Sequence, residues 1–287
     1  MTLDLWYTLA YLAPDGRADY ATARRACWRA PLREGGRSPA DAARAVRDLE
    51  RAAADREHRG RSFPIPDQAR WMADRTGIDV DPGRIAAGIA RALARAPVRL
   101  GPGVRPALAA LRRAGIPLGL VSNILYEPPG AVRALLRRLG IARYFRAIVL
   151  SCELAWAKPS PRPFRAALRT MGARPAGAIH VGDLGSDLLG ARRAGMTGVR
   201  LVGLARFRPR PRAPVRAPPG PIARVRSLPD LLDRLGLAAP VPVSRGRTAR
   251  APRGPRGGRP GRTRRPRPTP PRSPPGRRRE ARPPHGR

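Results

Sequence analysis

Short apolar runs alternate with helical segments from about residue 100 to residue 236, and this alternation most constrains the fold. The apolar runs are 116–121, 147–150, 178–181 and 199–202. Runs of this kind are typical of strands that are buried on both faces of a parallel sheet. Strands that alternate with helices at this spacing predict an α/β fold with a doubly wound parallel sheet, which is a Rossmann-like core.

Residues 14–98 follow a different pattern and predict an all-helical insertion of about four helices. Ser38-Pro39-Ala40-Asp41 is a typical helix start, with Ser at the N-cap, Pro at the first position and Asp at the third. Asp81-Pro82 begins another helix in the same way. We therefore expect a core made of residues 1–13 and 99–236, with a helical cap at 14–98.

The last part of the chain has a composition that predicts disorder. The chain carries 58 Lys and Arg against 20 Asp and Glu, which gives a formal charge of +38. Residues 241–287 contain 16 Arg and one Glu, but no Phe, Tyr, Trp, Ile or Leu. Because burial cannot offset the entropy cost of ordering such a segment, we expect a disordered Arg/Pro-rich tail at 237–287.

The tail has two interpretations. Its arginines would attract nucleic acid through the phosphate backbone, in a way that weakens as salt rises. Recognition would be non-specific, because the tail offers no aromatic side chain on which bases could stack. The plainer interpretation is a solvated extension without a binding role, and the sequence favours this one.

Other features exclude whole classes of protein. No apolar run approaches the ~20 residues of a membrane span, so no membrane contact is expected. The first residues show no basic segment followed by an apolar one, so no signal peptide is visible. Cys27 and Cys152 are too few for a disulfide framework or a zinc site. We expect a cytoplasmic protein, and the sequence leaves its oligomeric state open.

Polar residues follow the apolar runs at the points where the predicted strands end. They are Asp4, Ser122, Asn123 and Asp183. In doubly wound sheets these ends meet at one edge, where ligands bind. Lys158 is the only Lys among the 58 basic residues, which indicates a position that needs a compact ammonium group. Such a cluster suits a nucleophilic Asp, a cation between acidic groups and donors for a transferring anion.

These residues lie in four stretches that resemble the motifs of the haloacid dehalogenase-like (HAD) hydrolase superfamily. The stretches are 4–9 with its Asp and Thr-Leu, 119–123 ending in Ser-Asn, 158–164 beginning Lys-Pro, and 181–196 with Gly-Asp, a second acid and Ala-Gly-Met. Their order and their placement on the predicted elements support the resemblance more than any single motif does. The helical insertion resembles the cap of this family.

The resemblance implies catalytic and substrate-binding roles. Asp4 would be the nucleophile, and Ser122 would hydrogen-bond the transferring group. Lys158 would offset the negative charge of that group and of Asp4. Asn123 and Thr8 are expected to contact the substrate. A plainer interpretation of Ser122 and Asn123 is that they end a strand and cap the next helix.

The resemblance also implies a magnesium site. Asp183 would bind Mg²⁺ together with Asp4 and the backbone carbonyl of Trp6. Asp187 would either support the metal site or orient the catalytic lysine. Carboxylates near a phosphoryl group require positive charge, which agrees with a divalent cation at this position. His180, in the middle of a predicted strand, is expected to be a core histidine.

Trp6 departs from the family pattern and leaves three functions open. Phosphatases of the family usually have a second Asp at this position as general acid, and losing a general acid typically costs ~10²–10⁴ in rate. The first function is Mg²⁺-dependent hydrolysis of a small phosphorylated metabolite. The second is metal-independent 2-haloacid dehalogenation by Asp4, and the third is a catalytically weak binding protein. Asp183 and Asp187 favour the first, because dehalogenation gives no reason for an acidic pair.

Overall fold

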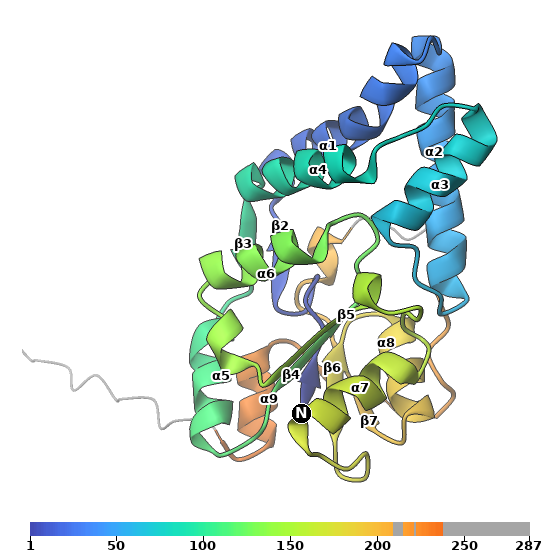
Figure 1. Cartoon of the computed structure of the whole chain (residues 1–287). Helices are drawn as coiled ribbons and strands as arrows, with labels where there is room; N and C mark the ends of the chain where they lie inside the picture. The colour runs from blue at the N-terminus through green and yellow to red at the C-terminus, as the bar shows by residue number, and fades with distance from the viewer. Residues whose placement is uncertain (209–214, 221, 238–287) are drawn as a thin grey trace, which may run out of the picture. The chain divides into compact units, whose positions relative to one another are not determined.

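The computed structural model describes residues 1–208, 215–220 and 222–237. Its core is a six-stranded parallel sheet in the order β5-β4-β1-β6-β7-β8 (Figure 1). The strands are β1 (Thr2–Leu3), β4 (Gly119–Ser122), β5 (Ala147–Leu150), β6 (Ile179–Gly182), β7 (Thr197–Leu201) and β8 (Ala223–Val225). The predicted α/β fold is therefore confirmed. Beyond Leu237, the predicted tail lies outside the described residues.

Helices cover both faces of the sheet. The helices of the core are α5 (Val104–Arg113), α6 (Pro129–Arg138), α7 (Arg162–Met171), α8 (Gly185–Arg193) and α9 (Leu228–Arg234). Successive side chains of a strand point to opposite faces. Accordingly, Leu120 packs in the apolar cluster that contains α5, α6 and α9, whereas Val121 packs in the cluster that contains α7 and α8. This layering produces the doubly wound arrangement.

The insertion after the first strand is all-helical, as predicted. It consists of α1 (Pro14–Glu34), α2 (Pro39–His58), α3 (Ile65–Thr76) and α4 (Pro82–Arg95). Ser38 caps α2 by accepting a hydrogen bond from the Asp41 amide at 3.1 Å, and Asp81 caps α4. The four helices enclose an apolar cluster of their own around Trp28 and Met72. Because of this second cluster, the helical insertion has an interior separate from that of the sheet.

Two short strands that the sequence did not predict join the insertion to the core. They are β2 (Ala10–Leu12) and β3 (Val98–Leu100), which pair antiparallel. The strand β1 is only two residues long and stops immediately before Asp4. The chain then turns at Tyr7, whose φ of 61° lies in the left-handed region that bulky residues rarely adopt. This turn separates β1 from β2.

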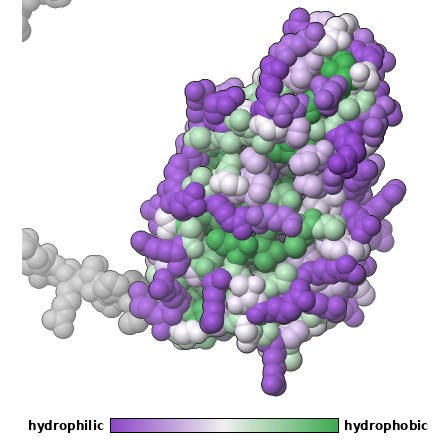
Figure 2. Space-filling model, in the orientation of Figure 1, coloured by the Kyte–Doolittle hydropathy of each residue, from purple (hydrophilic) through white to green (hydrophobic). Residues whose placement is uncertain are grey.

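The surface of the described residues is largely hydrophilic. Hydrophilic side chains cover most of the face shown in Figure 2, with smaller apolar areas between them. Val202 and Leu235 are the exposed large apolar side chains in the described part, at 38% and 37%. None of the described helices is both long and apolar enough to cross a bilayer.

Candidate active site

A cavity of 420 Å³ lies where the helical insertion faces the carboxyl ends of the central strands. Asp4, Lys158 and Asp187 line it from the core, and Glu57 lines it from α2. The Asp4 amide donates to the Val181 carbonyl at 2.9 Å, which fixes the backbone of Asp4 beside β6. The predicted edge of the sheet is therefore where these charged side chains meet.

Lys158 is the buried cation at the centre of this cluster. Its Nζ donates to Asp4 Oδ1 and to Asp187 Oδ1, each at 2.6 Å, and to the Val121 carbonyl at 3.0 Å. These three acceptors use all three ammonium protons. Burial opposes the charged form, but Asp187 and Asp4 outweigh it and hold the pKa of Lys158 above its usual value. The lysine is therefore charged and fixed in orientation.

Asp187 is fully engaged by neighbouring donors. Its Oδ1 also accepts from His180 Nε2 at 3.2 Å, and its Oδ2 accepts from the Leu184 amide at 2.8 Å. Burial would raise the pKa of Asp187, but Lys158 and His180 more than offset this and hold it well below its usual range. This geometry favours positioning of Lys158 over metal ligation, which were the two roles expected for Asp187.

His180 lies behind Asp187 and is buried completely. Its Nδ1 is 2.9 Å from Thr2 Oγ1, while Nε2 faces the carboxylate of Asp187. Burial lowers the pKa of His180 and so favours the neutral ring. Because a carboxylate only accepts, Nε2 carries the proton and Nδ1 accepts from Thr2. The placement agrees with the core histidine expected from the sequence.

Arg208 pairs with the remaining carboxylate of the site, and sequence reasoning missed it. Its Nε and Nη2 donate to the two oxygens of Asp183 at 2.5 and 2.8 Å, and Nη2 lies 3.3 Å from the Trp6 carbonyl. The guanidinium also lies over the ring of Tyr7, 4.4 Å from its centroid. Burial raises the pKa of Asp183 to about 7 although Arg208 opposes this. One arginine in an Arg-rich stretch gives no sequence signal.

The residues present fit a divalent cation. Asp4, Asp183 and Asp187 each bring one carboxylate oxygen within 4.8 Å of the others. Carboxylate and carbonyl oxygens are the donors that Mg²⁺ prefers. The guanidinium of Arg208 contacts both Asp183 and the Trp6 carbonyl. These two groups therefore point towards one position, where a cation is favoured.

The three other predicted residues lie in different surroundings. Ser122 Oγ is buried and has no hydrogen-bond partner among the described residues. Asn123 binds the backbone of Lys158 from both ends of its amide, at 2.8 and 3.0 Å. Thr8 does not line the cavity but faces a separate one beside Gly101. This placement gives no support to the predicted substrate contact of Thr8, because its hydroxyl is not in the same cavity as Asp4.

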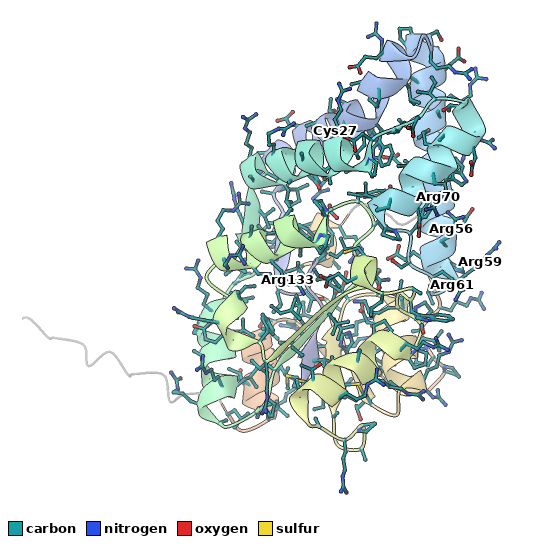
Figure 3. All side chains as sticks on the ribbon, viewed as in Figure 1. Cys27, Arg56, Arg59, Arg61, Arg70 and Arg133 are labelled. Atoms are coloured by element: carbon teal, nitrogen blue, oxygen red, sulfur yellow. The ribbon has the colours of Figure 1, made fainter. Side chains whose placement is uncertain are left out.

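Glu57 is a further cavity residue that sequence reasoning missed. Its Oε1 accepts a hydrogen bond from Asn123 Nδ2 at 2.8 Å. The end of α2 is held against the core by a hydrogen bond from the Ala157 amide to the Gly60 carbonyl at 3.0 Å. Figure 3 labels Arg56, Arg59 and Arg61 around this end of α2. On a helix with so many charges, one Glu carries no signal of a cavity position.

Comparisons with known proteins identify the family to which this chain is similar. A model of the haloacid dehalogenase-like hydrolases matches residues 18–195, which include Lys158 and Asp183. Glyceraldehyde 3-phosphate phosphatase of Methanopyrus kandleri is 39% identical over 132 residues, which cover 44% of this chain and 54% of that protein. Phosphoglycolate phosphatase of Escherichia coli is 37% identical over 100 residues, which cover 35% and 38%. The chain thus spans about half or less of the length of these curated relatives.

A solved structure extends the comparison to most of the described fold. The 2-haloacid dehalogenase of Pseudomonas syringae pv. Tomato DC3000 is 26% identical with a TM-score of 0.54. The alignment covers 82% of this chain and 96% of that one. The match of the family model to residues 18–195, which is more than half of the chain, establishes the family. The chain belongs to the haloacid dehalogenase-like hydrolases.

Proposed function

We propose that this hydrolase removes phosphate from a small phosphorylated metabolite, with Asp4 as nucleophile and Mg²⁺ as cofactor. The observation that carries the proposal is the state of the Asp4 carboxylate. Lys158 holds Oδ1 at 2.6 Å, whereas Oδ2 has no hydrogen-bond partner among the described residues. Asp4 also lines the cavity, so Lys158 orients one oxygen and the other is left to act as the nucleophile.

The other residues have roles that follow from their charge and placement. Lys158 offsets the negative charge of the attacking carboxylate and of the arriving phosphoryl group. Ser122 Oγ, at the end of β4, is a buried donor that has no hydrogen-bond partner among the described residues. Asn123 fixes the backbone of Lys158 and so positions its ammonium group. Held by Asp4, Asp183 and the Trp6 carbonyl, Mg²⁺ would supply electrostatic stabilisation of the phosphoryl oxygens.

The substrate class rests on the relatives and on the size of the site. Both curated relatives are named for phosphatase activity on three-carbon or two-carbon phosphorylated compounds. The cavity of 420 Å³ suits a ligand of this size. We infer a small phosphomonoester that enters from the side of the helical insertion.

The test is hydrolysis of an aryl phosphate and of acetyl phosphate, with Mg²⁺ and with chelator, by wild type and by Asp4→Asn. The proposal predicts turnover that requires both Mg²⁺ and Asp4. Turnover that persists in chelator would contradict the metal role. No turnover by folded, metal-saturated wild type would contradict the phosphatase activity itself.

Two observations favour a second candidate, the hydrolysis of 2-haloacids by Asp4. Trp6 supplies no acidic proton, and halide leaving groups need none. The likeness to a solved 2-haloacid dehalogenase covers most of the chain. Chloride release from 2-chloropropionate in the presence of chelator would establish this alternative in place of the first.

A further inference from the structure

Arg208 occupies the position that two of the expected metal ligands face. It contacts Asp183 through two nitrogen atoms, at 2.5 and 2.8 Å, and Nη2 also reaches the Trp6 carbonyl at 3.3 Å. These are the carboxylate and the carbonyl that would hold Mg²⁺ with Asp4. A planar guanidinium matches a carboxylate with two parallel hydrogen bonds and stays charged at any ordinary pH.

The segment before Arg208 is anchored independently of the pair. Phe207 stacks on Tyr11 of β2, with ring centroids 4.2 Å apart and an angle of 8° between the planes. Arg17 of α1 donates a hydrogen bond to the Phe207 carbonyl. The backbone therefore holds Arg208 beside Asp183, while the side chain keeps 19% of its surface exposed.

We propose that Arg208 competes with Mg²⁺ for Asp183 and the Trp6 carbonyl, so that the ion binds only when the guanidinium moves away. The proposal deepens the proposed function, because it concerns the cofactor of the same site. A ligand that must displace a resident group binds more weakly by the cost of the displacement. Removing the guanidinium therefore tightens metal binding.

The experiment measures metal binding directly, by electron paramagnetic resonance of Mn²⁺ and by calorimetry with Mg²⁺. Arg208→Gln is expected to bind either ion about tenfold more tightly than wild type, or more. Arg208→Lys, which cannot form the two-pronged pair, is expected between the two. Arg206→Gln removes an exposed neighbouring arginine and is expected to bind as wild type does.

Equal or weaker binding by Arg208→Gln would overturn the proposal. Wild-type affinity in Asp183→Asn would also overturn it, because the ion would then lie elsewhere. Both outcomes are read from binding, so they are distinct from a failure of the phosphatase activity. That activity is tested by turnover of wild type against Asp4→Asn.

A different observation concerns the proton that Trp6 cannot supply. The carboxyl groups that line the cavity are Asp4, Glu57, Glu127 and Asp187. Asp187 is engaged by Lys158, and Glu127 accepts a hydrogen bond from the Tyr20 hydroxyl at 2.7 Å. Glu57 also accepts a hydrogen bond, but its partner Asn123 holds the backbone of Lys158 as well, so this carboxyl is tied to the catalytic lysine of the cavity.

Glu57 faces charged groups of both the core and the helical insertion. The charges of Lys158, Arg208 and Asp4 act on the carboxyl group of Glu57. The charge of Glu57 acts in turn on the hydroxyl of Tyr126. Burial is the largest effect and raises the pKa of Glu57, with Asn123, Lys158 and Arg208 opposing it. The protonated form therefore persists to higher pH than for an exposed glutamate.

We infer that Glu57 is the general acid that protonates the leaving group, in place of an acid at position 6. An oxygen of Asp4 forms a bond to phosphorus, the bond from phosphorus to the leaving oxygen breaks, and the Glu57 proton passes to that oxygen. The inference rests on the proposed function. It requires Glu57 to be protonated, so this step slows as pH rises through the pKa of Glu57.

The test compares kcat/KM for an alkyl phosphomonoester, whose leaving group needs a proton, with that for acetyl phosphate, whose leaving group does not. Glu57→Gln is expected to lose ~10²-fold on the alkyl substrate and far less on acetyl phosphate. It is also expected to lose the fall in kcat/KM that wild type shows with rising pH. Glu34→Gln, at an exposed pair with Arg84 on the same insertion, is the control.

Equal losses on the two substrates would contradict the inference and indicate a structural role for Glu57. An unchanged pH profile in Glu57→Gln would contradict it as well. If wild type turns over acetyl phosphate, the proposed function stands whichever of these results is found. The two failures are therefore distinguishable.

Discussion

Lys158 and Arg208 each hold a carboxylate of the same cavity, but the structure holds the two cations differently. The Lys158 side chain is 3% exposed, and its partner Asp187 is 1% exposed. The Arg208 side chain is 19% exposed, although its partner Asp183 is 2% exposed. The lysine is thus almost fully buried, whereas the arginine keeps part of its side chain exposed.

The two cations also differ in the contacts that hold them and their partners in place. Lys158 is held at the backbone by Asn123, and its partner Asp187 is held by His180 and the Leu184 amide. Arg208 is held by an aromatic stack at Phe207. The lysine half of the site, which is Lys158 with Asp4 and Asp187, is therefore fixed by many contacts. The arginine half, which is Arg208 with Asp183, is the one in which we propose that the cation exchanges.

The largest effect is expected at Asp4, which Lys158 holds and which would bind Mg²⁺ together with Asp183. Asp4→Asn removes the nucleophile and is expected to lower kcat at least ~10³-fold, because no other carboxyl takes its place. Steady-state turnover of acetyl phosphate measures this loss. Asp19→Asn, at an exposed position on α1, should keep wild-type turnover. A loss of less than tenfold in Asp4→Asn would reject Asp4 as the nucleophile.

The next effect compares how much Lys158 and Arg208 each contribute to the stability of the fold. Lys158→Met leaves two buried carboxylates without their cation, and breaking a buried pair in this way costs about 3–5 kcal/mol. Arg208→Met is expected to cost less, because Arg208 is more exposed than Lys158 and because the pKa of Asp183, about 7, allows this carboxyl to take up a proton. Urea unfolding at pH 7.5 measures both. An equal or larger loss in Arg208→Met would break the distinction between the halves.

Lys158 and the carboxylates of both halves were predictable from the sequence, whereas Arg208 was not. Asp4, Ser122 and Asp183 follow apolar runs, so the topology of a parallel sheet brings them to one edge. Lys158 was marked by its being the only lysine in an arginine-rich chain. Local pattern and motif spacing therefore carried the information for these positions.

The remaining site residues depend on contacts between distant parts of the chain. Glu57 enters the cavity because α2 ends against the loop before Lys158, and Arg208 because Phe207 packs on Tyr11. The spacing of apolar residues along the sequence does not predict contacts between such distant segments. The same limit applies to β2 and β3, which are three residues each and stable only as a pair. Short strands of this kind give too little pattern to be read alone.

A smaller effect probes the close packing of the lysine half. A Cβ added at Gly182 would lie 2.2 Å from Cγ of Asp187, so the carboxylate cannot keep its place in Gly182→Ala. Overpacking of this kind costs about 1–3 kcal/mol, and activity should fall with it. Gly130→Ala is the matched control, because no atom lies within 4 Å of its added Cβ and it begins a helix. Thermal unfolding compares the two variants. Equal melting temperatures would show that Asp187 can move aside without loss of stability.

The smallest effect concerns the residue behind the lysine half. His180→Asn shortens the donor to Asp187 and is expected to lower kcat/KM about tenfold, because partners of this kind orient the group in front of them. The protein should remain folded, since Lys158 and the Leu184 amide still hold Asp187. His58→Asn, at an exposed position at the end of α2, is the control for substituting a histidine. Wild-type kcat/KM in His180→Asn would mean that Lys158 alone keeps Asp187 oriented. His180 would then have no part in fixing the lysine half of the site.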